Sequence, residues 1–238
     1  MHPPVNINCD LGEGLDNEAT LMPLIHSCNI ACGGHAGDKA TMKRVVELAR
    51  KFGVAIGAHP SYPDREHFGR VSLKMEDEAF KSNLKQQLDD FVEVLGGHTE
   101  DLHHIKAHGA LYNDLAVNES LARNYLEVLE PYKANTLLYV PFDSVLERMA
   151  LETGFKVAVE AFGDRNYNDD LTLVSRRDPE ALITENKKVL AHVQEILRGW
   201  VTTVEGHMKP LKADTICMHS DTANAVANLE YLKMHLNY

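Results

Sequence analysis

Short apolar runs alternate with longer amphipathic segments along the chain. Most of the runs are only a few residues long and rich in Val, Ile and Leu, which is typical of strands covered on both faces of a parallel sheet. The runs predicted as strands are residues 5–9, 29–31, 54–58, 104–106, 136–140, 156–160 and 215–218.

The segments between these runs carry signals for the starts and ends of helices. Asp38 is placed to cap a helix, and Gly53 is placed to end it in a left-handed conformation. The apolar face of this helix is expected to hold Met42, Val45, Ala49 and Phe52. Further helices are expected to begin at Ser72, at Asn118, at Asp178-Pro179 and near Asp221-Thr222.

Strand and helix alternate about seven times, which predicts βαβ units and a mainly parallel sheet. A closed barrel and an open doubly wound sheet both fit this pattern. No linker rich in Pro, Gly or Ser interrupts the chain, so we expect a single α/β domain over residues 1–238. Residues 202–212 form the least regular segment and are a candidate for an extra hairpin.

The composition is that of an ordinary globular protein, with 44% hydrophobic and 25% charged residues in a chain of 238. The net charge of −11 argues against nucleic acid or anionic lipid as a partner, because both require a basic surface. No apolar run approaches the ~18 residues of a membrane span, and the N-terminal residues lack the pattern of a secretory signal. With four cysteines that are expected to stay reduced, these features predict a cytoplasmic protein.

Polar groups follow six of the predicted strands, usually beside Gly or Pro. Because parallel strands point their carboxyl ends to one face, these groups are expected to converge where barrels and open sheets both bind ligands. Four of the 13 histidines belong to this set, which favours function over chance placement. The candidates are Asp10, Glu13, Gly33, Gly34, His35, Gly37, Asp38, His59, Lys106, His108, Arg165, His219 and Asp221.

Taken singly, several of these residues have a purely structural interpretation. Asp38 and Asp221 are placed to cap helices, Lys106 is expected to be solvated, and His59 fits a buried core position. Outside the set, His192 is expected on the surface of a long helix.

Familiar cofactor and nucleophile motifs are absent from the sequence. It contains no G-x-x-x-x-G-K-[ST] phosphate loop, no complete G-x-G-x-x-G after a strand and no G-x-S-x-G elbow. Gly33, Gly34 and Gly37 precede a helix and are placed to let backbone N–H groups approach a phosphate or carboxylate. Cys28 and Cys32 lack the tight Cys-x-x-Cys spacing of a structural zinc site.

Six strings together resemble the LamB/YcsF family, in the family's order and from residue 5 to about residue 225. They are NCDLGEG at 8–14, NIACGGHAGD at 29–38, GAHPSYPDR at 57–65 with FGR at 68–70, KAHGALYN at 106–113, FGDR at 162–165 and ICMHSD at 216–221. The sequence departs from the family at Ala107, Gly163 and Ser220, where Pro, Ala and Gly are usual. None of these departures removes a charged or imidazole group.

The resemblance implies a distorted, seven-stranded TIM-like α/β barrel, related to the glycoside hydrolase and metal-dependent deacetylase superfamily. It also implies cleavage of 5-oxo-L-proline to L-glutamate, driven by ATP hydrolysis, together with 5-oxoprolinase subunits B and C. Such chemistry needs cations for phosphate, carboxylates for a metal or a water, and donors for the developing oxyanion.

The resemblance assigns expected roles to the candidate residues. Lys106, Arg165 and the turn at Gly33, Gly34 and Gly37 are expected to meet phosphate, with His219 and Asp221 as further substrate contacts. Asp10, Glu13, His35, Asp38, His59 and His108 are the expected catalytic groups. Asp10, His35 and His59 are the candidate ligands of a divalent ion, Mg²⁺ or Zn²⁺.

Two other functions remain open from the sequence. One is a metal-dependent amide hydrolase or deacetylase that needs no ATP, with a metal-bound water as nucleophile. The other is a protein that binds 5-oxoproline without catalysing its cleavage, because a binding pocket also needs convergent polar groups.

Overall fold

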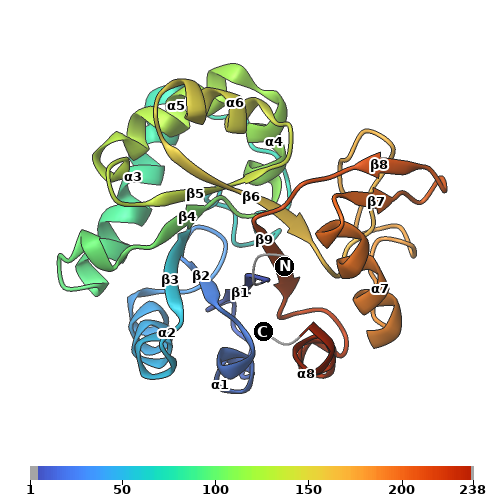
Figure 1. Ribbon diagram of the computed structural model, residues 1–238. Coiled ribbons are helices and arrows are strands. Elements are labelled where there is room, and N and C mark those ends of the chain that lie inside the picture. Colours follow the sequence, from blue (N-terminus) through green and yellow to red (C-terminus); the bar gives the residue numbers. More distant parts are fainter. Residues whose placement is uncertain (1–4, 237–238) are drawn as a thin grey trace.

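Seven parallel strands close into a barrel in the computed structural model, which describes residues 5–236 (Figure 1). The last strand in the sequence, β9, pairs with both β1 and β6 and so closes the ring. This confirms the barrel and excludes the open sheet. In barrel order the strands are β1 (Ile7–Leu11), β2 (Ser27–Ala31), β3 (Ala55–His59), β4 (His104–Lys106), β5 (Leu137–Pro141), β6 (Lys156–Phe162) and β9 (Thr215–His219).

Side chains on the barrel strands alternate between an apolar outer face and a polar interior, as the period of two of a strand requires. On β1, Ile7, Cys9 and Leu11 belong to the hydrophobic core outside the barrel. Between them, Asn8 and Asp10 reach across the interior to side chains of other strands. The strands are therefore buried on both faces, as predicted, but only their outer face is apolar.

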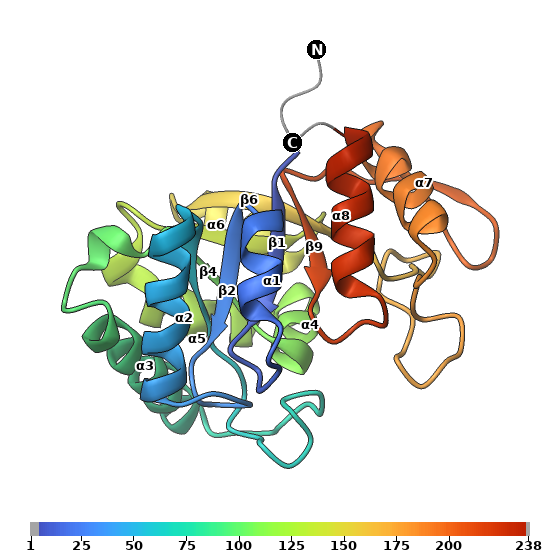
Figure 2. The ribbon, with the colours of Figure 1, turned by 90° about the horizontal axis from the view of Figure 1, so that it is seen from below.

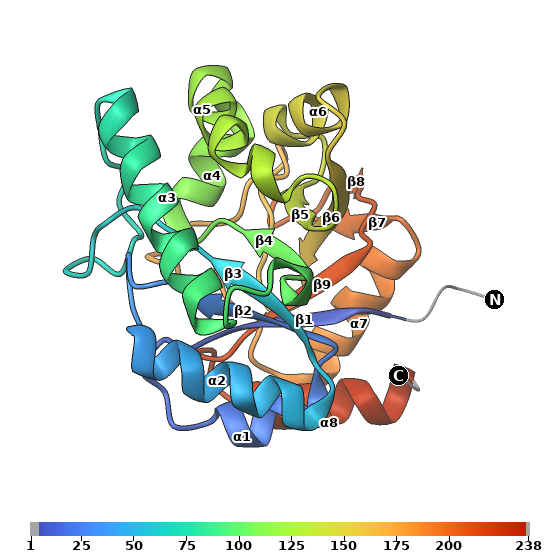
Figure 3. The same cartoon turned by 90° about the vertical axis from the view of Figure 1, so that its left-hand side faces the viewer.

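Two groups of helices cover the barrel on opposite sides, as Figure 3 shows. One group holds α1 (Glu18–Leu21), α2 (Lys39–Phe52) and α8 (Ala225–Leu236). The other holds α3 (Asp77–Val94), α4 (Gly109–Val117), α5 (Glu119–Leu129) and α6 (Val145–Glu152). Helix α7 (Asn186–Leu197) packs beside α8, and short 3-10 turns lie at Met22–Leu24, Thr99–Asp101 and Glu130–Tyr132.

The irregular segment at 202–212 contains part of an antiparallel hairpin, which confirms that prediction. Its strands are β7 (Trp200–Thr202) and β8 (Met208–Pro210), and β7 packs against α7. The hairpin lies outside the barrel, beside α7 in Figure 1.

Long loops after β3 and β6 extend beyond the end of the barrel to which the arrow of β9 points, at the lower edge of Figure 2. The colour bar places the first loop in cyan and the second in yellow to orange. Because all the barrel strands are parallel, this is the end where the predicted site residues are expected to converge.

Several helix starts differ from the sequence-based prediction. Helix α3 begins at Asp77 rather than Ser72, because the Ser72 hydroxyl donates to Asp114 and holds the preceding segment in a loop. Helix α7 begins at Asn186, since Asp178 instead accepts from the backbone N–H of Glu180 in a turn. Helix α8 begins at Ala225, because the residues after β9 form turns.

Two side chains also differ from their predicted burial. Phe52 ends α2 with 41% of its surface exposed, so it lies outside the apolar face of that helix. His192 is buried rather than exposed, with Nε2 3.2 Å from the carbonyl oxygen of Phe162. Among the described residues, no helix is both long and apolar enough to cross a membrane.

Candidate active site

A cavity of about 630 Å³ opens at the carboxyl end of the barrel. Its lining comes mainly from strand ends and from the loops after β3 and β6. Seven of the predicted residues line it: Asp10, Glu13, His59, Lys106, His108, Arg165 and His219. The sequence therefore placed the pocket at the correct end of the fold.

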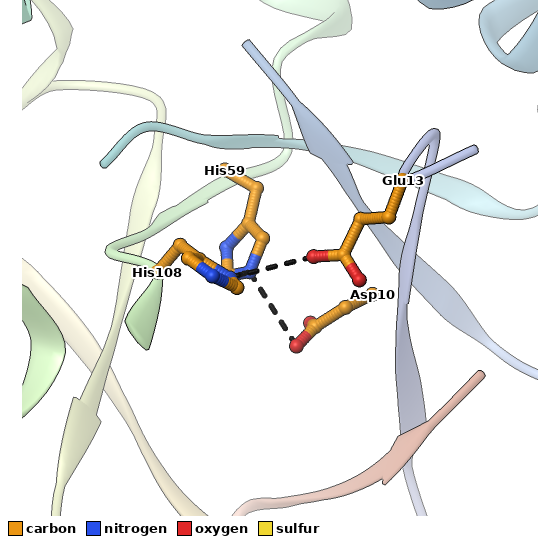
Figure 4. Close-up of side chains that lie close together, drawn as sticks. All are labelled: Asp10, Glu13, His59 and His108. Atoms are coloured by element: carbon orange, nitrogen blue, oxygen red, sulfur yellow. Dashed lines mark hydrogen bonds and ion pairs between the residues drawn. The ribbon is translucent and has the colours of Figure 1, made fainter. Parts of the chain in front are cut away.

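Four of these residues form a tight group that we call the floor cluster: Asp10, Glu13, His59 and His108 (Figure 4). One ligand atom from each lies within 4.8 Å of the others. His59 Nε2 is 3.4 Å from Asp10 Oδ2, and His108 Nδ1 is 3.4 Å from Glu13 Oε1. The two imidazoles approach each other to 3.0 Å between His59 Nε2 and His108 Nδ1.

Backbone carbonyls fix the tautomers of both histidines. His59 Nδ1 is 2.8 Å from the carbonyl oxygen of Lys106, and His108 Nε2 is 2.9 Å from that of Phe68. Because a carbonyl only accepts, both of these ring nitrogens must carry hydrogen. In the neutral rings, the two nitrogens that face each other are then both lone pairs, and they require a shared proton or a cation between them.

The floor cluster fits a divalent cation. Burial, together with the nearby His35 and His59, holds the pKa of His108 well below its usual value, which disfavours the shared proton. Two carboxylates and two imidazoles form a donor set suited to zinc and similar ions. Carbonyl groups that fix the tautomers of ligating imidazoles are a common feature of metal sites.

His35 lies behind the floor cluster rather than in it. Its ring stacks on His108 with centroids 3.5 Å apart, and its Nε2 is 3.0 Å from Glu13 Oε1. The side chain is buried and does not line the pocket, and burial lowers its pKa. Of the predicted ligands Asp10, His35 and His59, the structure thus groups the first and third with Glu13 and His108.

Lys106 is buried inside the barrel rather than solvated. Its Nζ is 2.9 Å from both Asp10 Oδ1 and Glu160 Oε1 and 3.1 Å from Cys217 Sγ. Burial alone would lower the pKa of Lys106, but these neighbours hold it well above its usual value. The ammonium group is paired with two carboxylates inside the barrel, instead of with the phosphate predicted for it.

The same network keeps Asp10 ionised. Burial would raise the pKa of Asp10, but the charge of His59 when it is protonated, together with the ammonium group of Lys106, holds it well below its usual value. Asn29 Nδ2 donates to Asp10 Oδ1 at 2.7 Å, and Asn29 Oδ1 lies 2.6 Å from His104 Nε2. Asp10 is thus a preformed, oriented carboxylate at the bottom of the pocket.

Sequence reasoning missed the supporting residues of this network. Asn8 donates to Glu160 at 2.9 Å, and Gly57 leaves the space that the His104 ring fills. The available signal was the presence of Asn8 and Asn29 inside otherwise apolar strands, since a buried amide requires partners. His104 begins the strand predicted at 104–106, and its ring lies buried between Asn29 and Tyr139.

A loop over the floor cluster depends on two glycines. Gly69 has a φ of 63°, and a Cβ there would lie 2.9 Å from His35 Cβ. A Cβ on Gly109 would lie 2.5 Å from the carbonyl oxygen of Gly69. This close approach lets Phe68 pack edge-on against the rings of His35 and His108.

The predicted phosphate turn does not line the pocket. The N–H of Gly33 donates to the carbonyl of Ala36 at 2.9 Å, and a side chain on Gly34 would meet Ser61 and Gln87. A Cβ on Gly37 would lie 2.9 Å from the carbonyl oxygen of Ala31. These glycines therefore serve turn geometry and close packing.

Asp38 also lies outside the pocket. It is exposed, and it caps α2 by accepting from the N–H of Thr41 at 2.8 Å. This is the structural role that its sequence position also predicted.

The remaining candidates are His219, which lines the cavity, and Asp221, which does not. His219 Nδ1 is 2.8 Å from Asp164 Oδ1, a buried carboxylate whose pKa falls because His219 outweighs the effect of burial. Asp221 does not line the pocket and instead pairs through Oδ2 with Arg70 at 2.7 Å and with Arg176 at 2.9 Å. Neither arginine was predicted as a site residue from the sequence, although both line the pocket.

Comparisons with known proteins show the family to which the chain belongs. The sequence matches the LamB/YcsF family over residues 5–238. The A subunit of 5-oxoprolinase from Pyrococcus abyssi is 38% identical over 96% of this chain and 92% of that protein, and its counterpart from Bordetella pertussis is 36% identical over 99% and 96%. The crystal structure of a lactam utilization protein from Thermus thermophilus matches with a TM-score of 0.89 and 30% identity, over 99% of this chain and 96% of that one. The chain therefore belongs to the LamB/YcsF family.

Proposed function

We propose that this chain is the A subunit of an ATP-dependent 5-oxoprolinase, which opens the lactam ring of 5-oxo-L-proline to give L-glutamate. The relatives named as A subunits of 5-oxoprolinase cover nearly the whole chain, and the Thermus thermophilus neighbour is named for lactam utilization. The observation that carries the proposal is the floor cluster, which gathers two carboxylates and two imidazoles at the bottom of one cavity.

The reaction adds water to the lactam carbonyl carbon and breaks the ring C–N bond, and the nitrogen leaves as an amine after gaining a proton. Asp10 is held ionised, and the lone pair on His59 Nε2 faces the same space, so both can accept a proton from the attacking water. A lactam is a stable amide, so we assign the driving force to ATP hydrolysis by the assembled complex with subunits B and C.

The residues of the floor cluster would also hold a divalent metal ion. Such an ion lowers the pKa of a bound water and polarises a carbonyl oxygen. His35 would then orient Glu13 through the contact between its Nε2 and Glu13 Oε1.

A second candidate function is metal-dependent amide hydrolysis without ATP. The facing lone pairs of His59 and His108 favour it, because they require a cation between them. A divalent cation at this place would activate a water molecule without any nucleotide. The predicted glycine turn also lies outside the cavity lining among the described residues.

One experiment separates these functions. The purified chain, alone and assembled with subunits B and C, is assayed for glutamate release from 5-oxoproline, with and without ATP. Release only by the ATP-supplied complex supports the proposal. Release by the chain alone without ATP supports the second function. If a complex carrying Asp10→Asn releases glutamate as fast as the wild type, the chain is a binding protein without a catalytic role.

A further inference from the structure

Four arginines line the cavity, in a chain whose net charge is −11. We call Arg70, Arg165, Arg176 and Arg177 the arginine rim. Arg70 follows β3 and the other three follow β6, so two separate loops bring them together. The protein is acidic overall, but the arginine rim is a local concentration of positive charge.

The positive charge of the rim is only partly neutralised. Arg70 and Arg176 share one carboxylate oxygen of Asp221. Arg165 donates from Nε and Nη2 to the carbonyls of Ala181 and Val174. Within residues 5–236, Arg165 Nη1 and the whole Arg177 guanidinium make no hydrogen bond or ion pair.

Three arginines elsewhere in the chain are each paired with carboxylates. Arg44 forms a two-pronged contact with Glu18, and Arg50 pairs with Asp101. Arg148 has two carboxylate partners, Glu119 and Glu152. In the rim, by contrast, the only carboxylate that forms an ion pair with any of the four guanidinium groups, among the described residues, is Asp221. Burial, and after it the charge of Arg176, lowers the pKa of Arg165 to about 10, whereas Asp164 raises it; a bound anion would act in the same direction as Asp164.

We infer that the arginine rim is an oxyanion site that holds a carboxylate or phosphoryl group of the ligand while the reacting amide reaches the floor cluster. The fork of the guanidinium matches the geometry of both groups. The statement that the ligand carries a reacting amide rests on the proposed function. Four guanidinium groups with one ion-paired carboxylate offer more donors than the single carboxylate of 5-oxoproline can use, and the 630 Å³ cavity exceeds the needs of one five-membered lactam. The rim therefore also has the charge and the space to take a phosphoryl group.

The test is direct binding to the full chain, measured by isothermal titration at low ionic strength. The probes are inorganic phosphate, 5-oxoproline and the uncharged lactam 2-pyrrolidinone. The variant is Arg176→Gln/Arg177→Gln, on a partly exposed loop, and the matched control is Arg123→Gln on the exposed face of α5. Circular dichroism verifies that each variant is folded.

We expect the rim variant to bind at least one anion about 10-fold or more weakly, which is the usual effect of lost charge-assisted hydrogen bonds. A loss confined to phosphate assigns the rim to a phosphoryl group, and a loss confined to 5-oxoproline assigns it to the carboxylate. Binding of 2-pyrrolidinone and the Arg123→Gln control should be unchanged.

The inference is overturned if the wild-type chain binds neither anion at millimolar concentration, or if the rim variant binds both within twofold of wild type. Glutamate release by the assembled complex is measured separately. If the complex releases no glutamate while anion binding still depends on the rim, the proposed function fails and the oxyanion site stands.

Discussion

The floor cluster and the arginine rim face the same cavity but are built in opposite ways. Asp10 and His59 are the fourth and fifth residues of five-residue strands, and their side chains are buried and fixed by barrel contacts. Arg70 and Arg176 lie on long loops and are tied together through Asp221 alone, with side chains 39% and 24% exposed. A site that must hold reacting groups to a fraction of an ångström belongs on rigid strand ends, whereas a site that recognises charge tolerates loops.

The largest effect should come from removing the cation inside the barrel. Lys106→Met leaves Asp10 and Glu160 buried without their shared partner, and breaking a buried pair in this way costs about 3–5 kcal/mol. Chemical denaturation measures the loss. The matched control Lys85→Met removes an exposed pair with Asp89 and should cost about 1 kcal/mol or less. Equal losses for the two variants would show that the barrel interior does not depend on Lys106.

The next effect separates the floor from the scaffold. Asp10→Asn keeps the shape of the side chain but removes the charge, so turnover by the assembled complex should fall by about 10² or more per folded molecule. Asp89→Asn on the surface of α3 is the control and should leave turnover unchanged. Near wild-type turnover for Asp10→Asn would show that the floor cluster does not take part in the reaction.

A smaller effect should follow from the residue behind the floor. His35→Asn cannot reach Glu13, and loss of a supporting contact of this kind typically costs about 10-fold or more in metal affinity or activity. His98→Asn, at an exposed histidine, is the control. If melting temperature falls and turnover merely tracks the folded fraction, His35 is a packing residue only.

The smallest effect concerns a histidine outside both regions. Burial lowers the pKa of His192, so the folded state binds its proton less readily than the unfolded state does. Its contribution to stability is therefore present above the unfolded pKa of about 6.5 and is lost as the pH falls towards the folded pKa. Urea midpoints at pH 7 and pH 5.5 should differ less in His192→Gln than in the wild type. An unchanged difference would show that other groups carry the whole acid response.

The same contrast explains what the sequence could predict. The outer faces of the strands are apolar, so the alternation of apolar runs and helices predicted a parallel α/β sheet, closed or open, and the family resemblance implied the barrel. Because Asp10, His59, His108 and His219 follow predicted strands, the same pattern placed them at one end. The interior polar network was harder to predict, because Lys106 and Glu160 look solvated until the topology brings them together. Of the rim, only Arg165 was predicted as a site residue, because the loops that carry the other three arginines have no periodic pattern. Only the folded chain brings Arg70 near Arg176. The glycine pattern after β2 predicted a phosphate-binding turn, and this prediction was wrong, since Gly33, Gly34 and Gly37 serve turn geometry and packing.

Our central proposal is that the floor cluster is the chemical end of the pocket and that its four residues would hold a divalent cation. Titration of the chelator-treated chain with Zn²⁺ or Mn²⁺ tests this directly, with Glu13→Gln/His108→Gln as the variant and Asp89→Asn as the control. We predict about one bound ion per chain for the wild type and the control, and a loss of affinity of about 10² or more for the variant, which lacks two of the four ligands. A wild-type chain that binds neither ion, in a complex whose turnover survives the chelator, would contradict the account.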